Sequence, residues 1–265
     1  MIVHPSNSNI RDASYTPIYI NTKNNNFLPN VNFFKSITDP NLFSFATHNV
    51  RSCFSEQKLR QIETFYNSYN FDILGLSETH LTSTQAFYLS KNFSNKSYKF
   101  LFYSKNPKPN CQGIGFIVKN YIYDHIASEQ SFFDRVAMID LHFKNRTKLR
   151  IIQIYLPTNI ADDAQHKLRL DIEKKLTELI IDALHNSTHI VLMGDFNIDI
   201  YSKKKLNRRQ RLHHSFIDKL YNLNMLNTAT PFLKPDAPFL ICLLLFVRTP
   251  HILITFLHSF LSHMI

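Results

Sequence analysis

Acid and amide side chains follow a short apolar run in the segment HIVLMGDFNID. Residues 190–193 have the composition of a buried strand, and Gly194 permits an abrupt change of backbone direction. Asp195 and Asn197 come next. In an extended chain, residues two apart point the same way, so these two side chains would face one spot. An ordinary turn is the alternative, because Gly, Asp and Asn are common turn formers.

Three other apolar segments also end in polar residues, namely Asn49, Glu78 and Tyr155. Open α/β sheets bind their ligands beyond the ends of strands. We therefore expect these side chains to meet Asp195 and Asn197 around one pocket.

This set of side chains suits the hydrolysis of a phosphodiester. A divalent cation must neutralise the phosphate and the leaving oxygen, and Glu78 is a suitable hard ligand for Mg²⁺. Asp195 could accept the proton of the attacking water. Asn49 and Asn197 could donate to the non-bridging oxygens without adding charge, and the Tyr155 phenol could donate to the phosphate or the leaving group.

Each of these residues also has a structural interpretation. Glu78 could be a plain loop acid, and Tyr155 could close a core at an edge strand. His48 and His80 flank the key positions, but single histidines at strand ends are more often structural than catalytic.

Strands and helices alternate along the chain, but strands also come in runs, which predicts an α/β fold with mixed sheets. Ser55 could cap a helix over 56–70, Asp162 or Asp163 opens a long amphipathic helix, and 215–226 has the pattern of another. The expected strands cover 42–50, 71–81, 98–104, 113–119, 135–143, 148–157 and 189–195.

The charge balance points to a polyanionic partner. The 265 residues carry a formal charge of +10, which suits nucleic acid or a phosphorylated surface. Three dispersed cysteines without a CxxC pair indicate neither a disulfide scaffold nor a zinc site. Together with a start that lacks a signal-peptide run, they favour an intracellular protein of the nucleus or cytoplasm.

Composition divides the chain into three parts. Residues 1–40 form an Asn-rich leader, 41–238 the folded domain, and 239–265 an apolar tail. The run 203–211, KKKLNRRQR, could be a solvated loop, a nucleic acid contact or a nuclear import signal. Within the tail, 239–247 has the length of a strand. A membrane anchor stays open, although Arg248 and Pro250 split the tail into pieces too short to span comfortably.

The motifs THNVRS, LSETHL, GIGFIV, IYLPTN and MGDFNID, in this order, resemble the endonuclease/exonuclease/phosphatase superfamily. The resemblance covers about residues 42–235. It is closest to the endonuclease domains of LINE-type retroelements, which are relatives of AP endonucleases and pancreatic DNase. It implies a DNase I-like four-layer α/β sandwich, with two mixed β-sheets flanked by helices. It also implies cleavage of phosphodiesters with Mg²⁺ or Mn²⁺, and DNA or RNA as the partner.

The resemblance also assigns roles by position. Asn49 and Glu78 would serve the metal and the phosphate, and Tyr155 would assist at the phosphate. Asp195 would align or activate the water, with Asn197 as its neighbour. Two further positions lie where relatives often contact the nucleic acid backbone, namely Arg135 and Asn159.

One family motif is missing from this sequence. The family ends with Ser-x-Asp-His on its last strand, whereas the last acidic residue here is Asp236 and no Asp-His pair follows it. The fold would then be incomplete at its C-terminal end, as a frameshifted gene model would make it. We therefore expect an endonuclease of retroelement type that nicks DNA, inactive or weak without this pair. The alternatives are a non-catalytic nucleic-acid-binding remnant and a phosphatase or phosphodiesterase of the same superfamily.

Overall fold

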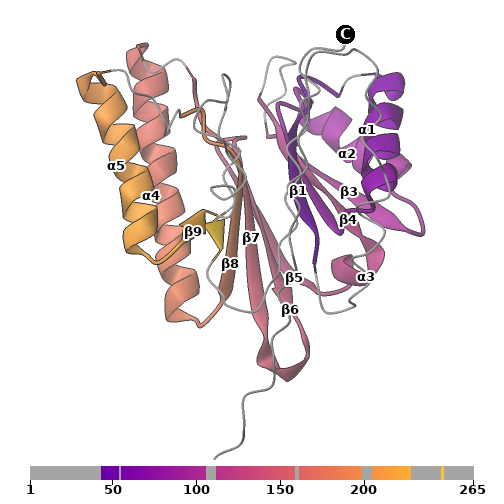
Figure 1. Cartoon of the computed structure of the whole chain (residues 1–265). Coiled ribbons are helices and arrows are strands. Elements are labelled where there is room, and N and C mark those ends of the chain that lie inside the picture. Colours follow the sequence, from indigo (N-terminus) through magenta and orange to yellow (C-terminus); the bar gives the residue numbers. More distant parts are fainter. Residues whose placement is uncertain are drawn as a thin grey trace, which may run out of the picture. The chain divides into compact units, whose positions relative to one another are not determined.

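Two β-sheets pack face to face in the computed structural model of this chain (Figure 1). The structure describes residues 43–53, 55–105, 112–158, 161–198, 205–227 and 246–247. The first sheet has the strand order β1-β2-β4-β3, in which β1 and β2 are parallel and the other pairs antiparallel. Its strands are β1 (Phe45–Asn49), β2 (Ile73–Ser77), β3 (Tyr98–Tyr103) and β4 (Ile114–Lys119).

The second sheet has six strands in the order β5-β6-β7-β8-β10-β9, with β7 and β8 as its parallel pair. These strands are β5 (Ile126–Phe132), β6 (Val136–His142), β7 (Lys148–Tyr155), β8 (His189–Asp195), β9 (Leu226–Asn227) and β10 (Phe246–Val247). Of the strand expected over 239–247, the structure describes only the last two residues. They insert between β8 and β9 as β10.

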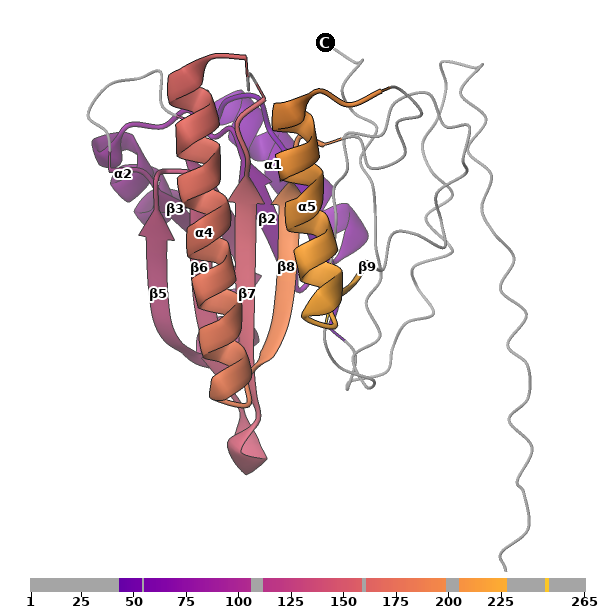
Figure 2. The same ribbon diagram turned by 90° about the vertical axis from the view of Figure 1, so that its left-hand side faces the viewer.

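Helices cover the outer face of each sheet (Figures 1 and 2). Helices α1 and α2 lie on the four-stranded sheet, and α4 and α5 lie on the six-stranded sheet. The helices are α1 (Glu56–Tyr69), α2 (Ser83–Phe93), α3 (Asn120–Tyr123), α4 (Asp163–His185) and α5 (Arg208–Asn222). The result is the expected four-layer α/β sandwich with two mixed sheets.

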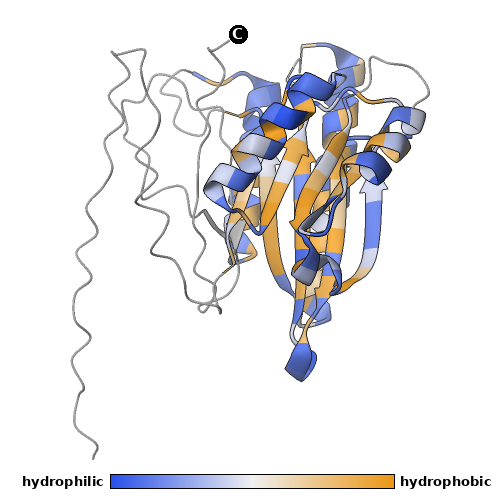
Figure 3. Ribbon diagram, turned by 90° about the vertical axis from the view of Figure 1, so that its right-hand side faces the viewer, coloured by the Kyte–Doolittle hydropathy of each residue, from blue (hydrophilic) through white to orange (hydrophobic). Residues whose placement is uncertain are grey.

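The core has three apolar layers, and the alternation of side chains along the strands separates them. In β7, Ile151 faces the other sheet, whereas Ile152 packs against α4 and α5. Ile73, Phe116 and Val191 fill the layer between the two sheets. Figure 3 shows these strands as largely hydrophobic and the exposed helix faces as hydrophilic. This shared layer fixes the two sheets relative to each other, and with them the strand ends at the edge of each sheet.

Most predicted elements are present, and helix capping accounts for several boundaries. Ser55 caps α1 and Asp162 caps α4, as expected. The prediction that the last helix begins at Ser215 is wrong. Asn207 and Gln210 form a capping box that starts α5 at Arg208, so part of the basic run is helical rather than loop.

Several elements were not predicted, among them the helix α2 and the strand β5. Helix α2 buries only Ala86, so it shows no apolar stripe, although Thr82 and Gln85 form a capping box at its start. Strand β5 is an edge strand with little burial, so its apolar pattern is weak.

The predicted domain boundaries near residues 40 and 239 fall outside the described residues and stay predictions, as do the leader and most of the tail. Within the described part of the chain, no helix has the length and apolarity needed to cross a membrane.

Candidate active site at the strand ends

The parallel pair β1 and β2 brings Asn49 and Glu78 together. Asn49 is in register with Ser77, the last residue of β2, and Glu78 follows directly. The Asn49 Nδ2 donates to Glu78 Oε1 over 2.9 Å. Glu78 has a positive φ of 56°, so the chain turns sharply there. Backbone bonds from Ser52 N to Glu78 O and from Cys53 N to Thr79 O, 2.7 and 2.9 Å long, hold this turn.

The parallel pair β7 and β8 supplies the other half of the site. Tyr155 and Asp195 are in register at the ends of these strands. Asp195 is only 3% exposed, and its Oδ2 lies 3.4 Å from Asn49 Nδ2, across the interface between the sheets. The Asn49 amide therefore faces carboxylates from both sheets, Glu78 on one side and Asp195 on the other.

The backbone after Asp195 turns instead of staying extended. Gly194 has a φ of 133°, and a Cβ there would lie 2.1 Å from Ile154 O, so only glycine fits. Asn197 has a φ of 46°, and its N–H donates to Asp195 Oδ1 over 3.0 Å. The assumption that the chain stays extended after Asp195 is therefore wrong. The Asn197 Nδ2 donates to Leu156 O over 2.7 Å, and a role for this side chain at the phosphate stays a prediction. Asn197 fixes the Asp195 carboxylate through its backbone.

Burial sets the protonation of the central acid. Desolvation raises the pKa of Asp195 from 3.8 to about 6, against hydrogen bonds from Asn197 and Asn49 that lower it. The negative charge of Glu78 also raises the pKa of Asp195, whereas the positive charge of Arg169 lowers it. A carboxylate with such a pKa is ionised at neutral pH and remains basic enough to accept a proton.

Tyr155 is held as a proton donor. Burial raises the pKa of the Tyr155 phenol, and a hydrogen bond and the charge of Glu78 raise it further. The Arg135 guanidinium lies 4.9 Å from the Tyr155 ring centroid and donates to Tyr155 O over 3.4 Å. Arg135 is only 5% exposed and packs against the ring of Tyr155. Its contact with nucleic acid stays a prediction. Asn159 lies outside the described residues.

Arg169 of α4 belongs to the site, although the sequence reasoning missed it. Its guanidinium donates to Pro157 O, Phe196 O and Asn197 O over 2.9, 3.0 and 3.2 Å. Its Nε donates to Glu173 Oε1 over 3.0 Å. This buried ion pair fastens the loops after β7 and β8 to one helix. The available signal was an arginine and a glutamate four residues apart within the apolar stripe of α4.

The two flanking histidines differ in their contacts. His48 packs against Phe65 with ring centroids 5.4 Å apart, and burial lowers its pKa to about 4, so it is neutral at neutral pH. His80 Nε2 lies 4.0 Å from Glu78 Oε2, at the site. His48 therefore has a packing role, whereas His80 is a neighbour of the candidate metal ligand.

The donor set fits a hard cation that keeps several waters. No group of three or more His, Cys, Asp or Glu side chains able to hold a metal occurs among the described residues. The carboxylates of Glu78 and Asp195 lie on either side of the Asn49 Nδ2, at 2.9 and 3.4 Å. This nitrogen is a donor and cannot bind a cation, so the Asn49 ligand atom would be Oδ1, which accepts from Arg51 N over 3.2 Å. A divalent cation would relieve the repulsion between these carboxylates. Glu78 and Asn49 are the residues that would hold Mg²⁺, which needs few protein ligands.

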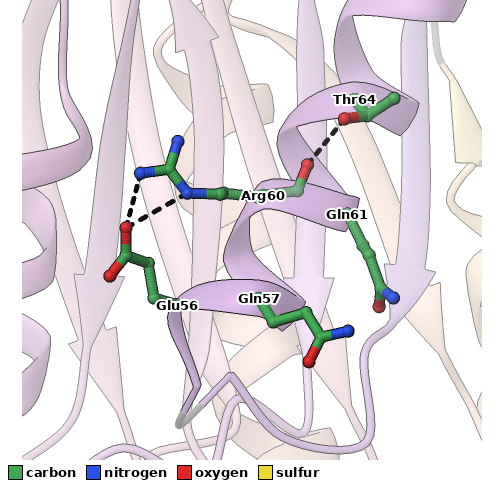
Figure 4. Close-up of a pocket in the computed structure, with 5 residues that line it drawn as sticks. All are labelled: Glu56, Gln57, Arg60, Gln61 and Thr64. Carbon is green, nitrogen blue, oxygen red and sulfur yellow. Dashed lines mark hydrogen bonds and ion pairs between the residues drawn. The ribbon is translucent and has the colours of Figure 1, made fainter.

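A separate surface hollow lies along α1 and is lined by Glu56, Gln57, Arg60, Gln61 and Thr64 (Figure 4). Glu56, Arg60 and Thr64 bond to one another. Arg60 Nη2 pairs with Glu56 Oε1 at 2.5 Å, and Thr64 Oγ1 donates to Arg60 O over 2.8 Å. We find no catalytic constellation in this hollow.

The fold is similar to that of known nucleases. The 3′ phosphatase NExo from Neisseria, bound to product DNA hairpin, is 16% identical with a TM-score of 0.55, covering 77% of this chain and 84% of that one. The AP endonuclease LMAP from Leishmania major is 13% identical with a TM-score of 0.55, covering 71% and 69%. At these identities the likeness shows the fold alone.

Sequence comparisons give the family. A search of curated proteins finds no match. The model of the Endonuclease/Exonuclease/phosphatase family matches residues 46–239, which contain every described residue of the site. The chain therefore belongs to the Endonuclease/Exonuclease/phosphatase family of hydrolases.

Proposed function

We propose that this chain is a Mg²⁺-dependent endonuclease of the retroelement type, which nicks DNA inside the cell. One observation carries the proposal: Asn49, Glu78 and Asp195 converge from two sheets beside the Tyr155 phenol. A buried acid with a raised pKa beside an uncharged donor is the arrangement that hydrolysis of a phosphodiester needs.

The residues would divide the chemistry as follows. Asp195, oriented by the Asn197 N–H, accepts the proton of the attacking water. Tyr155, kept protonated, donates a hydrogen bond to the phosphate or the leaving oxygen. Glu78 and Asn49 would hold Mg²⁺ (or Mn²⁺), which supplies positive charge against the phosphate when bound.

Charge and relatives support DNA as the substrate. The chain carries +10, which attracts a polyanion. NExo is a 3′ phosphatase bound to product DNA hairpin, and LMAP is an AP endonuclease. The retroelement assignment rests on the motif set from THNVRS to MGDFNID in the sequence.

A plasmid-nicking assay with Mg²⁺ against EDTA tests this function. We expect weak nicking by the wild type with Mg²⁺ and a further loss of at least about 100-fold in Asp195→Ala and Glu78→Ala. The first variant lacks the base for the attacking water, and the second lacks a ligand of the cation. Asp218→Ala, an exposed acid on α5, is the matched control and should nick normally. Equal nicking by all four proteins would refute the site.

A second candidate function is a non-catalytic DNA-binding remnant, favoured by the absence of an Asp-His pair after Asp236. It predicts DNA binding in EDTA and no Mg²⁺-dependent nicking. The superfamily alternative, a phosphatase, is tested by release of phosphate from phosphorylated lipids and inositols in the same Mg²⁺ buffer.

A further inference from the structure

The turn between β5 and β6 has an unusual residue at its tip. Arg135 N donates to Phe132 O over 3.1 Å, which closes a four-residue turn. Its two central residues, Phe133 and Asp134, have φ values of 58° and 52°. Turns with two left-handed residues favour Asn and Gly, and a bulky residue there is an outlier that costs about 1–2 kcal/mol.

The turn at the opposite end of β6 has the same backbone conformation with asparagine in place of phenylalanine. Thr147 N donates to Lys144 O over 3.3 Å, and Asn145 and Arg146 have φ values of 59° and 60°. The first left-handed position is therefore occupied by asparagine at one end of β6 and by phenylalanine at the other. Folding alone does not account for Phe133.

Packing does not account for Phe133 either. Its side chain is 45% exposed, whereas the neighbouring Phe132 is covered by the Lys175 ammonium, 4.7 Å from the ring centroid. The turn itself is braced. Lys105 N donates to Asp134 Oδ1 over 2.8 Å, and Lys105 Nζ donates to Ser131 O over 3.2 Å. A held turn thus presents an aromatic ring to solvent.

This turn lies at the same end of the sheet as the site. The arrowheads of β5 and β7 point to the same end (Figure 2). The Tyr155 N–H donates to Arg135 O over 2.8 Å, so the turn is joined by backbone to a candidate active-site residue. Phe133 is two residues from Arg135, whose guanidinium packs on the Tyr155 ring.

We propose that Phe133 stacks on a nucleobase of DNA at the rim of the site and thereby positions the strand to be nicked. This inference rests on the proposed function, because it takes DNA as the ligand. Every nucleobase has an aromatic face, so stacking on a protein ring contributes to DNA binding with little dependence on the base sequence. The strain at Phe133 is the kind of local cost that is found at functional sites.

A reciprocal pair of substitutions tests the proposal. Phe133→Asn places asparagine in the turn between β5 and β6, as in the turn between β6 and β7. Asn145→Phe places phenylalanine in the turn between β6 and β7. Binding of a fluorescein-labelled single-stranded or nicked oligonucleotide is measured by anisotropy in EDTA, where no hydrolysis occurs, and the melting temperature of each protein is recorded. Phe133→Trp keeps a ring and serves as the rescue variant.

We expect Phe133→Asn to raise the melting temperature while raising Kd about 5- to 100-fold. Asn145→Phe should lower the melting temperature and leave Kd unchanged, and Phe133→Trp should bind as the wild type does. The slope of log Kd against log salt concentration should stay constant in Phe133→Asn, because no phosphate contact is lost.

Unchanged DNA binding in Phe133→Asn would overturn the inference, as would a loss of binding to phosphatidylserine vesicles in that variant with DNA binding intact. The two proposals fail separately. A wild type that binds DNA without nicking it refutes the nuclease and leaves the stacking contact. A wild type that binds no DNA refutes both.

Discussion

Replacing Asp195 with asparagine should stabilise the metal-free protein at neutral pH while abolishing nicking. The cause is the burial of this carboxyl group, which raises its pKa from 3.8 to about 6. This increase in pKa corresponds to about 3 kcal/mol, at ~1.36 kcal/mol per pKa unit. The energy opposes folding at a pH where the group is ionised in both the folded and the unfolded state. The ionised carboxylate that catalysis would need therefore destabilises the folded protein.

The sign of the pH dependence follows from proton binding. Between about pH 4 and 6 the native protein holds a proton on Asp195 that the unfolded chain has released. The stability due to this group is thus complete below about pH 4 and is lost as the pH rises through about 6. Asp195→Asn removes this titration, so the free energy of unfolding of the variant should increase relative to that of the wild type as the pH rises.

The expected gain is about 1–3 kcal/mol, because asparagine keeps only one acceptor oxygen. Asp195 now accepts from both Asn197 N and Asn49 Nδ2, and the new amide can satisfy one of them without rearrangement. Urea unfolding in EDTA at pH 4.5 and 7.5 measures the effect, with Asp218→Asn on the exposed face of α5 as the control. A variant that is destabilised equally at both pH values would refute the reasoning.

Three other substitutions test the framework of the site, each by urea unfolding. Arg169→Met should cost about 3–5 kcal/mol, because it removes a buried ion pair and leaves Glu173 with His213 as its remaining partner. It also removes the hydrogen bonds to the carbonyls of the two loops. Gly75→Ala should cost about 1–3 kcal/mol, since the added Cβ would lie 2.0 Å from Gln153 Oε1 in the layer between the sheets. Asn207→Ala should cost about 1 kcal/mol by removing the cap of α5. Losses below about 0.5 kcal/mol would contradict the corresponding contact.

The sequence was sufficient to predict the strands of the site, because their signal is local. Apolar runs that end in Asn49, Glu78, Tyr155 and Asp195 can be read from the order of residues alone, and the structure brings these four side chains together. Their catalytic roles stay predictions.

What could not be predicted depends on contacts between distant segments. The Asn197 amide donates to the Leu156 carbonyl, a contact that depends on the parallel pairing of β7 and β8. Arginine is usually a surface residue, and the sequence does not show that the carbonyls of two distant loops accept hydrogen bonds from Arg169. Phe133 gave no sequence signal, because its backbone conformation is fixed by the pairing of β5 with β6.

The location of the site follows from one feature of the topology. Both sheets are mixed, but each contains one parallel pair, β1 with β2 and β7 with β8. Only parallel neighbours bring their C-terminal ends to the same edge, so each pair delivers two polar residues side by side. The Asn49 amide then joins the two edges through Glu78 and Asp195. A shift of one residue in either pair would turn its side chains to the other face and separate the carboxylates. The register of these two strand pairs therefore determines whether this chain has a site at all.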